Sequence, residues 1–409
     1  MEPRRRPAHR PAPHRHARSD MLFVSIVLDG VGVGDAPDAA AYGDDGADTL
    51  GHVCARERPR LPHLAALGLG RIASLDGVAP AAAPRASWGR LTETAAGKDS
   101  TTGHWALAGL PLARPFPTYP DGFPPEVVAA FCREAGVAGV LGNVPASGTA
   151  IIAELGAEHE RTGRPIVYTS GDSVFQVAAH TGTVPLDELY AMCRAARERV
   201  CVGEHAVGRV IARPFEGEPG AYARLSAARK DLSLPPPAPT VLDALQRAGV
   251  RTVAVGKIAA LFGGQGVDRE VKTAGNADGV AKTLAAIAEA ARSGAPTFVW
   301  TNLVDFDELY GHRNDPAGFA AALEAFDAAV PELVAALPRG ARLLLTADHG
   351  NDPTHPGTDH TRERVPVLLL RKGDEAGREI GTRALFADHA ATVADAFGVA
   401  WEGPGTAFG

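Results

Sequence analysis

One stretch near the carboxyl terminus, residues 343–361, constrains the fold of this chain more than any other. Its sequence, LLLTADHGNDPTHPGTDHT, opens as a buried parallel strand does and then changes abruptly to Asp348 and His349. Gly350 allows the backbone to turn there, and His360 follows after a polar loop. Carboxylates and imidazoles together suit zinc, manganese or iron. The pattern predicts a strand end that carries metal ligands; the alternative is a polar surface turn that happens to contain histidines.

Two further apolar runs end in the same way. Residues 21–28 lead to Asp29 and a glycine-rich turn, and residues 297–303 lead to Asp305, Asp307 and His312. In open α/β sheets, ligands bind beyond the carboxyl ends of the strands, so we expect these side chains to converge. They offer enough donors for two metal ions. Two metals suit phosphoryl transfer because they hold the transferring oxygens and lower the pKa of a hydroxyl.

The glycine-rich turn after Leu28 raises the alternative of a dinucleotide-binding loop. Its glycines follow a GxGxG spacing, whereas the dinucleotide fingerprint is GxGxxG. An acidic residue at the strand end would also repel a pyrophosphate. The metal-binding interpretation is therefore favoured.

A metal-assisted phosphoryl transfer needs a hydroxyl nucleophile, and residues 97–104 offer Ser100, Thr101 and Thr102. Small, charged and hydroxyl residues replace any apolar period between residues 95 and 105. We therefore expect a loop, which Trp105 would anchor.

Strands alternate with helices along most of the chain, which predicts an α/β fold with a mostly parallel sheet covered on both faces. Two proline-rich joints, at residues 111–124 and 235–239, bracket an insertion. We expect a disordered basic tail (1–20), a core (21–112 and 237–409) and an inserted α/β cap (113–236). The expected helices are 62–70, 126–135, 187–199, 240–248, 278–292, 316–337 and 388–397, and the expected strands are 21–28, 165–169, 207–212, 251–255, 297–303, 342–346 and 365–370.

Composition narrows the environment and the partners. The 409 residues carry a formal net charge of −7, which argues against non-specific binding of nucleic acid. The four cysteines form no CxxC pair, so the sequence predicts a reducing, cytoplasmic compartment. No apolar stretch approaches the ~20 residues of a membrane helix, and the basic start lacks a signal-peptide cleavage site. Translation from Met21 is an alternative start. We expect a monomer and leave an oligomer open.

Seven stretches, in order along nearly the whole chain, resemble the phosphopentomutase family of the alkaline phosphatase superfamily. They are IVLDGVGVGDAPDA (26–39), GKDSTTGHW (97–105), YTSGDSVFQVAAH (168–180), VGRVIARPF (207–215), GKI (256–258), TNLVDFDELYGHRND (301–315) and TADHGNDPTHPGTDHTRE (346–363). The DFDxxYGHRND and TDHTRE elements separate this family from cofactor-independent phosphoglycerate mutase. The resemblance implies an alkaline-phosphatase-like core with an inserted cap.

The resemblance also implies two Mn²⁺ ions, with other divalent cations as alternatives. One ion would be held by Asp29, Ser100, Asp348 and His349, and the other by Asp307, His312 and His360. Asp305 would then support the ligands. The chain departs from the family pattern at three positions: Ser100 replaces a threonine nucleophile, Ala106 replaces a glutamate and Gly30 replaces a serine. Of these, Ala106 opens the question of a shifted substrate preference.

The implied reaction interconverts ribose or deoxyribose 1-phosphate and 5-phosphate through phospho-Ser100 and a 1,5-bisphosphate. Glucose 1,6-bisphosphate or ribose 1,5-bisphosphate would serve as the activator. The resemblance places Asp172 at a position that contacts the sugar. Lys98 and Thr102 would support the nucleophile loop. The candidates for binding the second phosphate are Arg209, Arg213, Arg224, Arg229 and Lys257. The alternative for each is that it is a solvated surface charge.

Three alternative functions stay open on the sequence. A phosphatase or phosphodiesterase of the same superfamily would use the same metals but release the phosphoryl group to water. Another sugar-phosphate mutase or a phosphoglycerate mutase would act on a different substrate. A catalytically silent metal-binding or scaffold protein is the remaining class, although every expected ligand is present.

Overall fold

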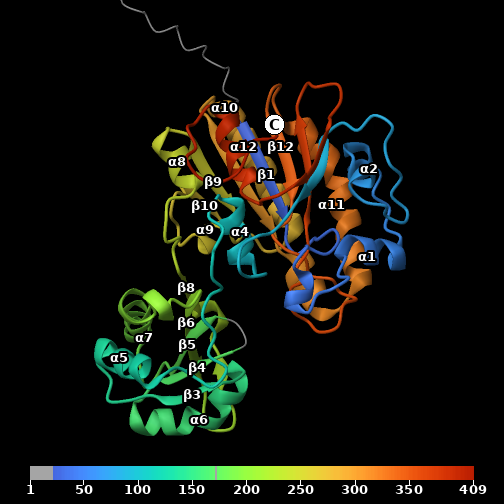
Figure 1. Ribbon diagram of the computed structural model, residues 1–409. Coiled ribbons are helices and arrows are strands. Elements are labelled where there is room, and N and C mark those ends of the chain that lie inside the picture. Colours follow the sequence, from blue (N-terminus) through green and yellow to red (C-terminus); the bar gives the residue numbers. More distant parts are fainter. Residues whose placement is uncertain (1–21, 171–172) are drawn as a thin grey trace, which may run out of the picture.

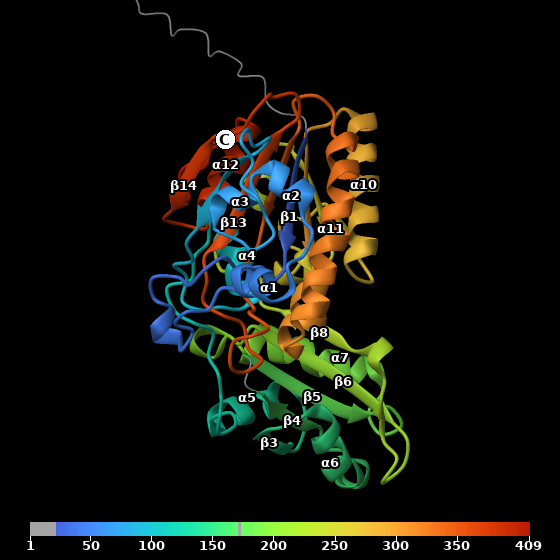
Figure 2. The same ribbon diagram turned by 90° about the vertical axis from the view of Figure 1, so that its right-hand side faces the viewer.

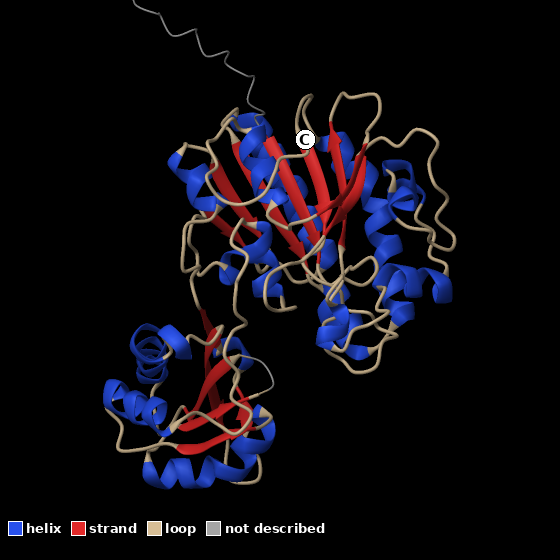
Figure 3. Ribbon diagram, in the orientation of Figure 1, coloured by secondary structure: helices blue, strands red, loops and turns tan. Residues whose placement is uncertain are grey.

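The computed structural model describes residues 22–170 and 173–409, which form two α/β units joined by two chain segments (Figures 1 and 3). The larger unit contains an eight-stranded mixed sheet in which five of the seven strand pairings are parallel. Its strand order is β10 (Arg269–Val271), β9 (Arg251–Val255), β11 (Thr297–Leu303), β1 (Leu22–Leu28), β12 (Arg342–Thr346), β13 (Val365–Arg371), β2 (Ser87–Leu91) and β14 (Glu379–Arg383).

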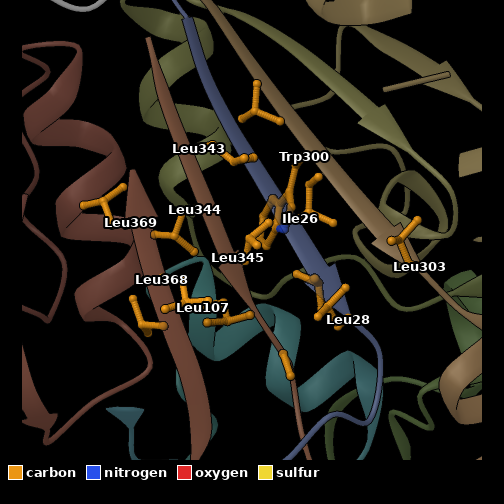
Figure 4. Packing of buried hydrophobic residues seen from close by; sticks show 14 of the residues in the cluster. Ile26, Leu28, Leu107, Trp300, Leu303, Leu343, Leu344, Leu345, Leu368 and Leu369 are labelled. Carbon is orange, nitrogen blue, oxygen red and sulfur yellow. The ribbon is translucent and has the colours of Figure 1, made fainter. Parts of the chain in front are cut away.

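The central strands of this sheet are buried on both faces. All seven residues of β1 and all seven of β11 are buried, which explains why both read as largely apolar runs in the sequence. Ile26, Leu345 and Trp300, from three adjacent strands, pack in one cluster (Figure 4). The central sheet therefore forms a rigid base for the loops that follow its strands.

Helices cover both faces of the large sheet (Figure 2). Helices α10 (Asn276–Ser293) and α11 (Pro316–Ala336) lie together on one face. Helices α4 (Ser100–Leu107), α8 (Val241–Arg247), α9 (Ile258–Leu261) and α12 (Asp388–Ala396) lie on the other. Three shorter helices, α1 (Thr49–Glu57), α2 (Pro62–Leu67) and α3 (Leu69–Ile72), lie near α11 and β13.

The smaller unit lies beyond the carboxyl ends of the parallel strands (Figure 1). Its strand order is β3 (Leu141–Pro145), β4 (Ile166–Thr169), β5 (Val174–His180), β6 (Arg209–Glu216) and β7 (Ala223–Arg224), and β8 (Lys230–Ser233) pairs with β6. Its helices are α5 (Pro125–Ala135), α6 (Gly148–Thr162) and α7 (Leu186–Ala195), which a π-helical turn continues to Val200. It has hydrophobic clusters of its own, separate from that of the larger unit.

The predicted α/β class and mostly parallel sheet are confirmed, and the expected strands of the larger unit agree to within one residue. The expectation of a loop through residues 95–105 was wrong in its second half, because α4 begins at Ser100. The short strands β2, β10 and β14 were missed because they are only partly buried. The predicted tail lies outside the described residues.

Within residues 22–170 and 173–409, no helix combines the length and apolar character that a membrane crossing requires.

Candidate active site

Three neighbouring strands deliver candidate metal ligands to one edge of the sheet. Asp29 follows β1, His349 follows β12, and Asp307 lies in a short π-helical turn (Phe306–Tyr310) after β11. Because these strands are adjacent and parallel, the three side chains meet. One ligand atom from each lies within 4.8 Å of the others.

A second cluster shares Asp307 with the first and adds two histidines. His312 comes from a 3₁₀ turn (Gly311–Arg313), and His360 comes from the loop after β12. Their ring centroids are 4.7 Å apart, and the ligand atoms of all three residues lie within 4.8 Å of one another. Asp307 therefore faces both clusters.

Asp348 is fully buried behind the first cluster. Its Oδ1 accepts the N–H of Gly30 at 3.2 Å, and its Oδ2 lies 3.4 Å from His349 Nε2. Gly30 has a φ of 75°, and a Cβ there would lie 3.3 Å from Asp307 Oδ1. Gly103 of α4 is more restricted, since a Cβ would lie 2.0 Å from the backbone oxygen of Asp348. Both glycines permit close approach around the ligands.

The residues present fit divalent metal ions. In the described part of the chain, three buried atoms of the candidate ligands have no hydrogen-bond partner: Asp29 Oδ1, Asp348 Oδ2 and His360 Nε2. Asp29 Oδ1 lies 3.3 Å from His349 Nε2, within ion-pair distance but without a hydrogen bond. Buried polar atoms are nearly always satisfied, so unsatisfied ligand atoms in two adjoining Asp/His clusters indicate a site for cations.

The electrostatics of the clusters point the same way. Burial opposes a charge on His349, but the carboxylates of Asp348 and Asp29 raise its pKa to about 10. The Asp307 carboxylate, 3.4 Å from His312, raises the pKa of that imidazole to about 9. Burial also opposes a charge on Asp307, yet the neighbouring histidines hold its pKa well below the usual value. The site therefore favours positive charge beside its acids.

Ser100 is the first residue of α4. Asp99 caps this helix by accepting the N–H groups of Thr101 and Thr102 at 2.9 and 3.1 Å, and it also accepts the Thr102 hydroxyl at 2.6 Å. Ser100 Oγ lies 3.1 Å from His349 Nε2. The hydroxyl is thus beside the first cluster and at a helix amino terminus, which favours anions.

Lys257 lies with Ser100 rather than with the arginines of the smaller unit. Its Nζ donates to Ser100 Oγ at 2.7 Å and forms an ion pair with Asp29. Burial opposes its charge, but the acids of the site, led by Asp29, raise its pKa. Lys98 instead pairs with Asp44 at 2.9 Å.

Asp305 contacts the start of a helix. Its carboxylate accepts the N–H of Asn276 at 2.7 Å and so caps the start of α10.

The arginines of the smaller unit divide into two groups. Arg209, Arg213 and Arg229 line a cavity of about 320 Å³ together with Gln176, which accepts a hydrogen bond from Arg213 Nε at 2.7 Å. Arg224 is exposed on β7 and does not line this cavity. Asp172 lies outside the described residues.

Asn302 and His104 contact the ligands and were not among the predicted site residues. Asn302 Nδ2 donates to Asp29 Oδ2 at 2.9 Å and lies 3.4 Å from His104 Nε2. His104 Nδ1 in turn lies 2.8 Å from the Ser100 carbonyl oxygen and 3.0 Å from Asp348 Oδ2. Two signals were available in the sequence. Asn302 is a polar residue at the end of an apolar strand, and His104 lies one turn after the candidate nucleophile.

Comparison with known proteins decides the family. The family described as the metalloenzyme superfamily matches residues 21–400. The phosphopentomutase of Anaeromyxobacter dehalogenans (strain 2CP-C) is 55% identical over 387 residues, which cover 94% of this chain and 97% of the relative. Those of Caldanaerobacter subterraneus subsp. tengcongensis and Deinococcus radiodurans are 52% and 51% identical and cover 94% and 95% of this chain, and 96% and 99% of their own lengths. The chain belongs to the phosphopentomutase family.

This membership confirms the family resemblance of the sequence motifs. One departure from the phosphopentomutase pattern, Ala106, can be placed in the structure. Ala106 is fully buried in the hydrophobic core of the larger unit, away from solvent. A residue in that position does not line a substrate cavity, so the structure offers no link between Ala106 and substrate preference.

Proposed function

We propose that this phosphopentomutase-family chain interconverts the 1-phosphates and 5-phosphates of ribose or deoxyribose through phospho-Ser100 and a 1,5-bisphosphate. The observation that carries the proposal is the position of Ser100 Oγ, 3.1 Å from His349 Nε2 and 2.7 Å from Lys257 Nζ, beside two Asp/His clusters. A hydroxyl in this setting is suited to accept a phosphoryl group.

The two clusters would hold two divalent cations, with Mn²⁺ as the expected metal. Asp29, Ser100, Asp348 and His349 would bind one ion, and Asp307, His312 and His360 would bind the other. A carboxylate oxygen of Asp307 also lies near Asp29 and His349 of the first cluster. Bound there, the cations supply neutralisation of phosphoryl charge and a lower pKa for the serine hydroxyl.

The residues of this chain would stabilise the phosphorylated serine. Lys257 supplies a positive charge at hydrogen-bond distance from Ser100 Oγ. The amino terminus of α4 adds a favourable helix dipole. Asp99 keeps the first turn of α4 in place through its cap, and Thr102 contributes one of the hydrogen bonds.

The smaller unit would act as a cap that holds the phosphate that is not being transferred. Arg209, Arg213 and Arg229 converge on one cavity, and guanidinium groups suit phosphate oxygens. Arg224 lies outside this cavity and is therefore a weaker candidate for binding that phosphate. The cap, residues 113–236, would exclude water and so favour transfer over hydrolysis. Asp172 stays the candidate for the sugar.

A bisphosphate activator, glucose 1,6-bisphosphate or ribose 1,5-bisphosphate, would charge Ser100 before the first turnover. The four cysteines are free thiols, three of them buried, which supports action in the reducing cytoplasm. We expect the working form to be a monomer.

The test is a coupled assay with ribose 1-phosphate, Mn²⁺ and glucose 1,6-bisphosphate. The proposal expects ribose 5-phosphate to form without release of inorganic phosphate. Stoichiometric phosphate release would instead identify a phosphatase, and turnover of 3-phosphoglycerate would identify a phosphoglycerate mutase.

A further inference from the structure

Arg362, two residues after the candidate ligand His360, holds the backbone that leads to Ser100. Its guanidinium is almost completely buried and has an acceptor for each of its five N–H groups. Nε and Nη2 form a bidentate pair with Asp38 at 3.0 and 2.9 Å. The other three bonds go to the backbone carbonyls of Glu93, Ala95 and Gly97, at 3.1, 2.9 and 2.6 Å.

A second contact fixes the same segment from the other side. The backbone N–H of Arg362 donates to Asp44 at 2.9 Å. Asp44 also accepts both hydrogen bonds of Lys98 Nζ, at 2.9 and 3.1 Å. Residues 93–98, which run directly into Asp99 and Ser100, are therefore tied at five points to Arg362 and to the loop that contains Asp38 and Asp44.

We infer that Arg362 is a positioning residue for the nucleophile: it fixes residues 93–97 so that Ser100 Oγ is held beside His349 and Lys257. Arg362 contacts neither Ser100 nor a substrate cavity among the described residues, so it acts through the backbone. This inference rests on the proposed role of Ser100.

The geometry explains why arginine is needed. Only a guanidinium offers five N–H donors in one plane, and it cannot lose its proton at ordinary pH. A lysine keeps the charge but has three donors, so it leaves two or more of the buried acceptors without a partner. Displacement of a reacting group by about 1 Å can cost about 100-fold in rate.

The experiment follows phosphorylation of Ser100 by intact-protein mass spectrometry after Mn²⁺-loaded full-length protein is mixed with glucose 1,6-bisphosphate. We expect Arg362→Lys to slow phosphorylation by about 10- to 100-fold relative to wild type. Metal content should be unchanged, and in steady state kcat should fall while KM for ribose 5-phosphate stays the same. A purely structural role would lower stability without this split between kcat and KM.

Two further variants keep the outcome interpretable. Arg364→Lys is the matched control, because Arg364 lies two residues along and donates to the backbone oxygen of Asp35, outside residues 93–98. Asp38→Asn weakens the bidentate pair with Arg362 at a side chain that is only half buried. If Arg362→Lys does not fold, this variant tests whether Arg362 positions Ser100.

Slow phosphorylation in folded Arg362→Lys, or in Asp38→Asn when Arg362→Lys does not fold, supports the inference if Arg364→Lys behaves as wild type. Wild-type rates in folded Arg362→Lys, or in Asp38→Asn when the former does not fold, would overturn it while leaving the proposed function intact. Absence of phosphate on Ser100 in the wild-type protein would overturn the nucleophile assignment and this inference together.

Discussion

Acid should destabilise the larger unit through His389, a buried histidine that supports the helix carrying Ser100. Its Nδ1 lies 2.9 Å from the backbone oxygen of Leu107, the last residue of α4, and its Nε2 lies 2.8 Å from Ser25 Oγ. A carbonyl only accepts, so Nδ1 carries the proton and Nε2 accepts the serine hydroxyl. Burial lowers the pKa of His389 from 6.5 to about 4.

The direction of the stability change follows from the number of protons that the folded and unfolded states bind. Between pH 6.5 and about 4 the unfolded chain binds a proton at this position and the folded protein does not, so stability falls as the pH falls through this window. Above pH 6.5 both states are neutral, and the residue has no effect. For these two pKa values the loss at pH 5 is about 2 kcal/mol, and it approaches about 3 kcal/mol near pH 4.

The assay is urea unfolding of metal-free protein, followed by tryptophan fluorescence at pH 7.5 and pH 5. All four tryptophans (88, 105, 300 and 401) lie outside residues 113–236, so the signal reports the larger unit. His389→Asn keeps a donor for Leu107 but cannot be protonated. We expect wild type to lose about 2 kcal/mol more than this variant on going to pH 5. Equal losses in the two proteins would refute the reasoning.

Four substitutions test the site itself. Asp307→Asn should weaken metal binding at the cluster with His312 and His360, and also at the first cluster because the Asp307 carboxylate lies near Asp29 and His349; the loss of affinity should exceed the roughly 10- to 100-fold typical of an outer partner. His312→Ala should weaken binding at its own cluster only. Retention of two ions per chain in Asp307→Asn, measured by elemental analysis, would contradict this role of Asp307. Arg213→Gln should cost about 2 to 5 kcal/mol in kcat/KM for ribose 5-phosphate while Ser100 is still phosphorylated by the activator. Arg224→Gln should cost less because Arg224 lies outside the arginine cavity, and an equal loss in both variants would show that the cavity is not the phosphate site.

The sequence predicted the parts of this site that lie directly after buried strands. Asp29 and Asp348 follow runs of apolar residues, and the register of adjacent parallel strands then brings them together without further information. Central strands are buried on both faces, so their apolar runs are easy to recognise. The convergence of ligands at the strand ends was therefore predictable.

Contacts made across long loops were not predictable in the same way. Lys257 was grouped with the phosphate-binding arginines, yet it reaches Ser100 across 157 positions of sequence. Arg362 reaches the carbonyl of Glu93 across 269 positions, and such side-chain-to-backbone bonds leave no periodic pattern. The start of α4 was hidden because Ser, Thr and Gly have low helix propensity, and the Asp99 cap compensates for this.

The central claim is that Ser100 carries the phosphoryl group, and mapping that phosphate tests it most directly. Wild-type protein is incubated with Mn²⁺ and glucose 1,6-bisphosphate, digested, and sequenced by peptide fragmentation. We expect a single phosphate on Ser100, its absence in Ser100→Ala together with loss of mutase activity, and retained activity in Ser100→Thr. Phosphate on Thr101 or Thr102, or full activity in Ser100→Ala, would contradict the account.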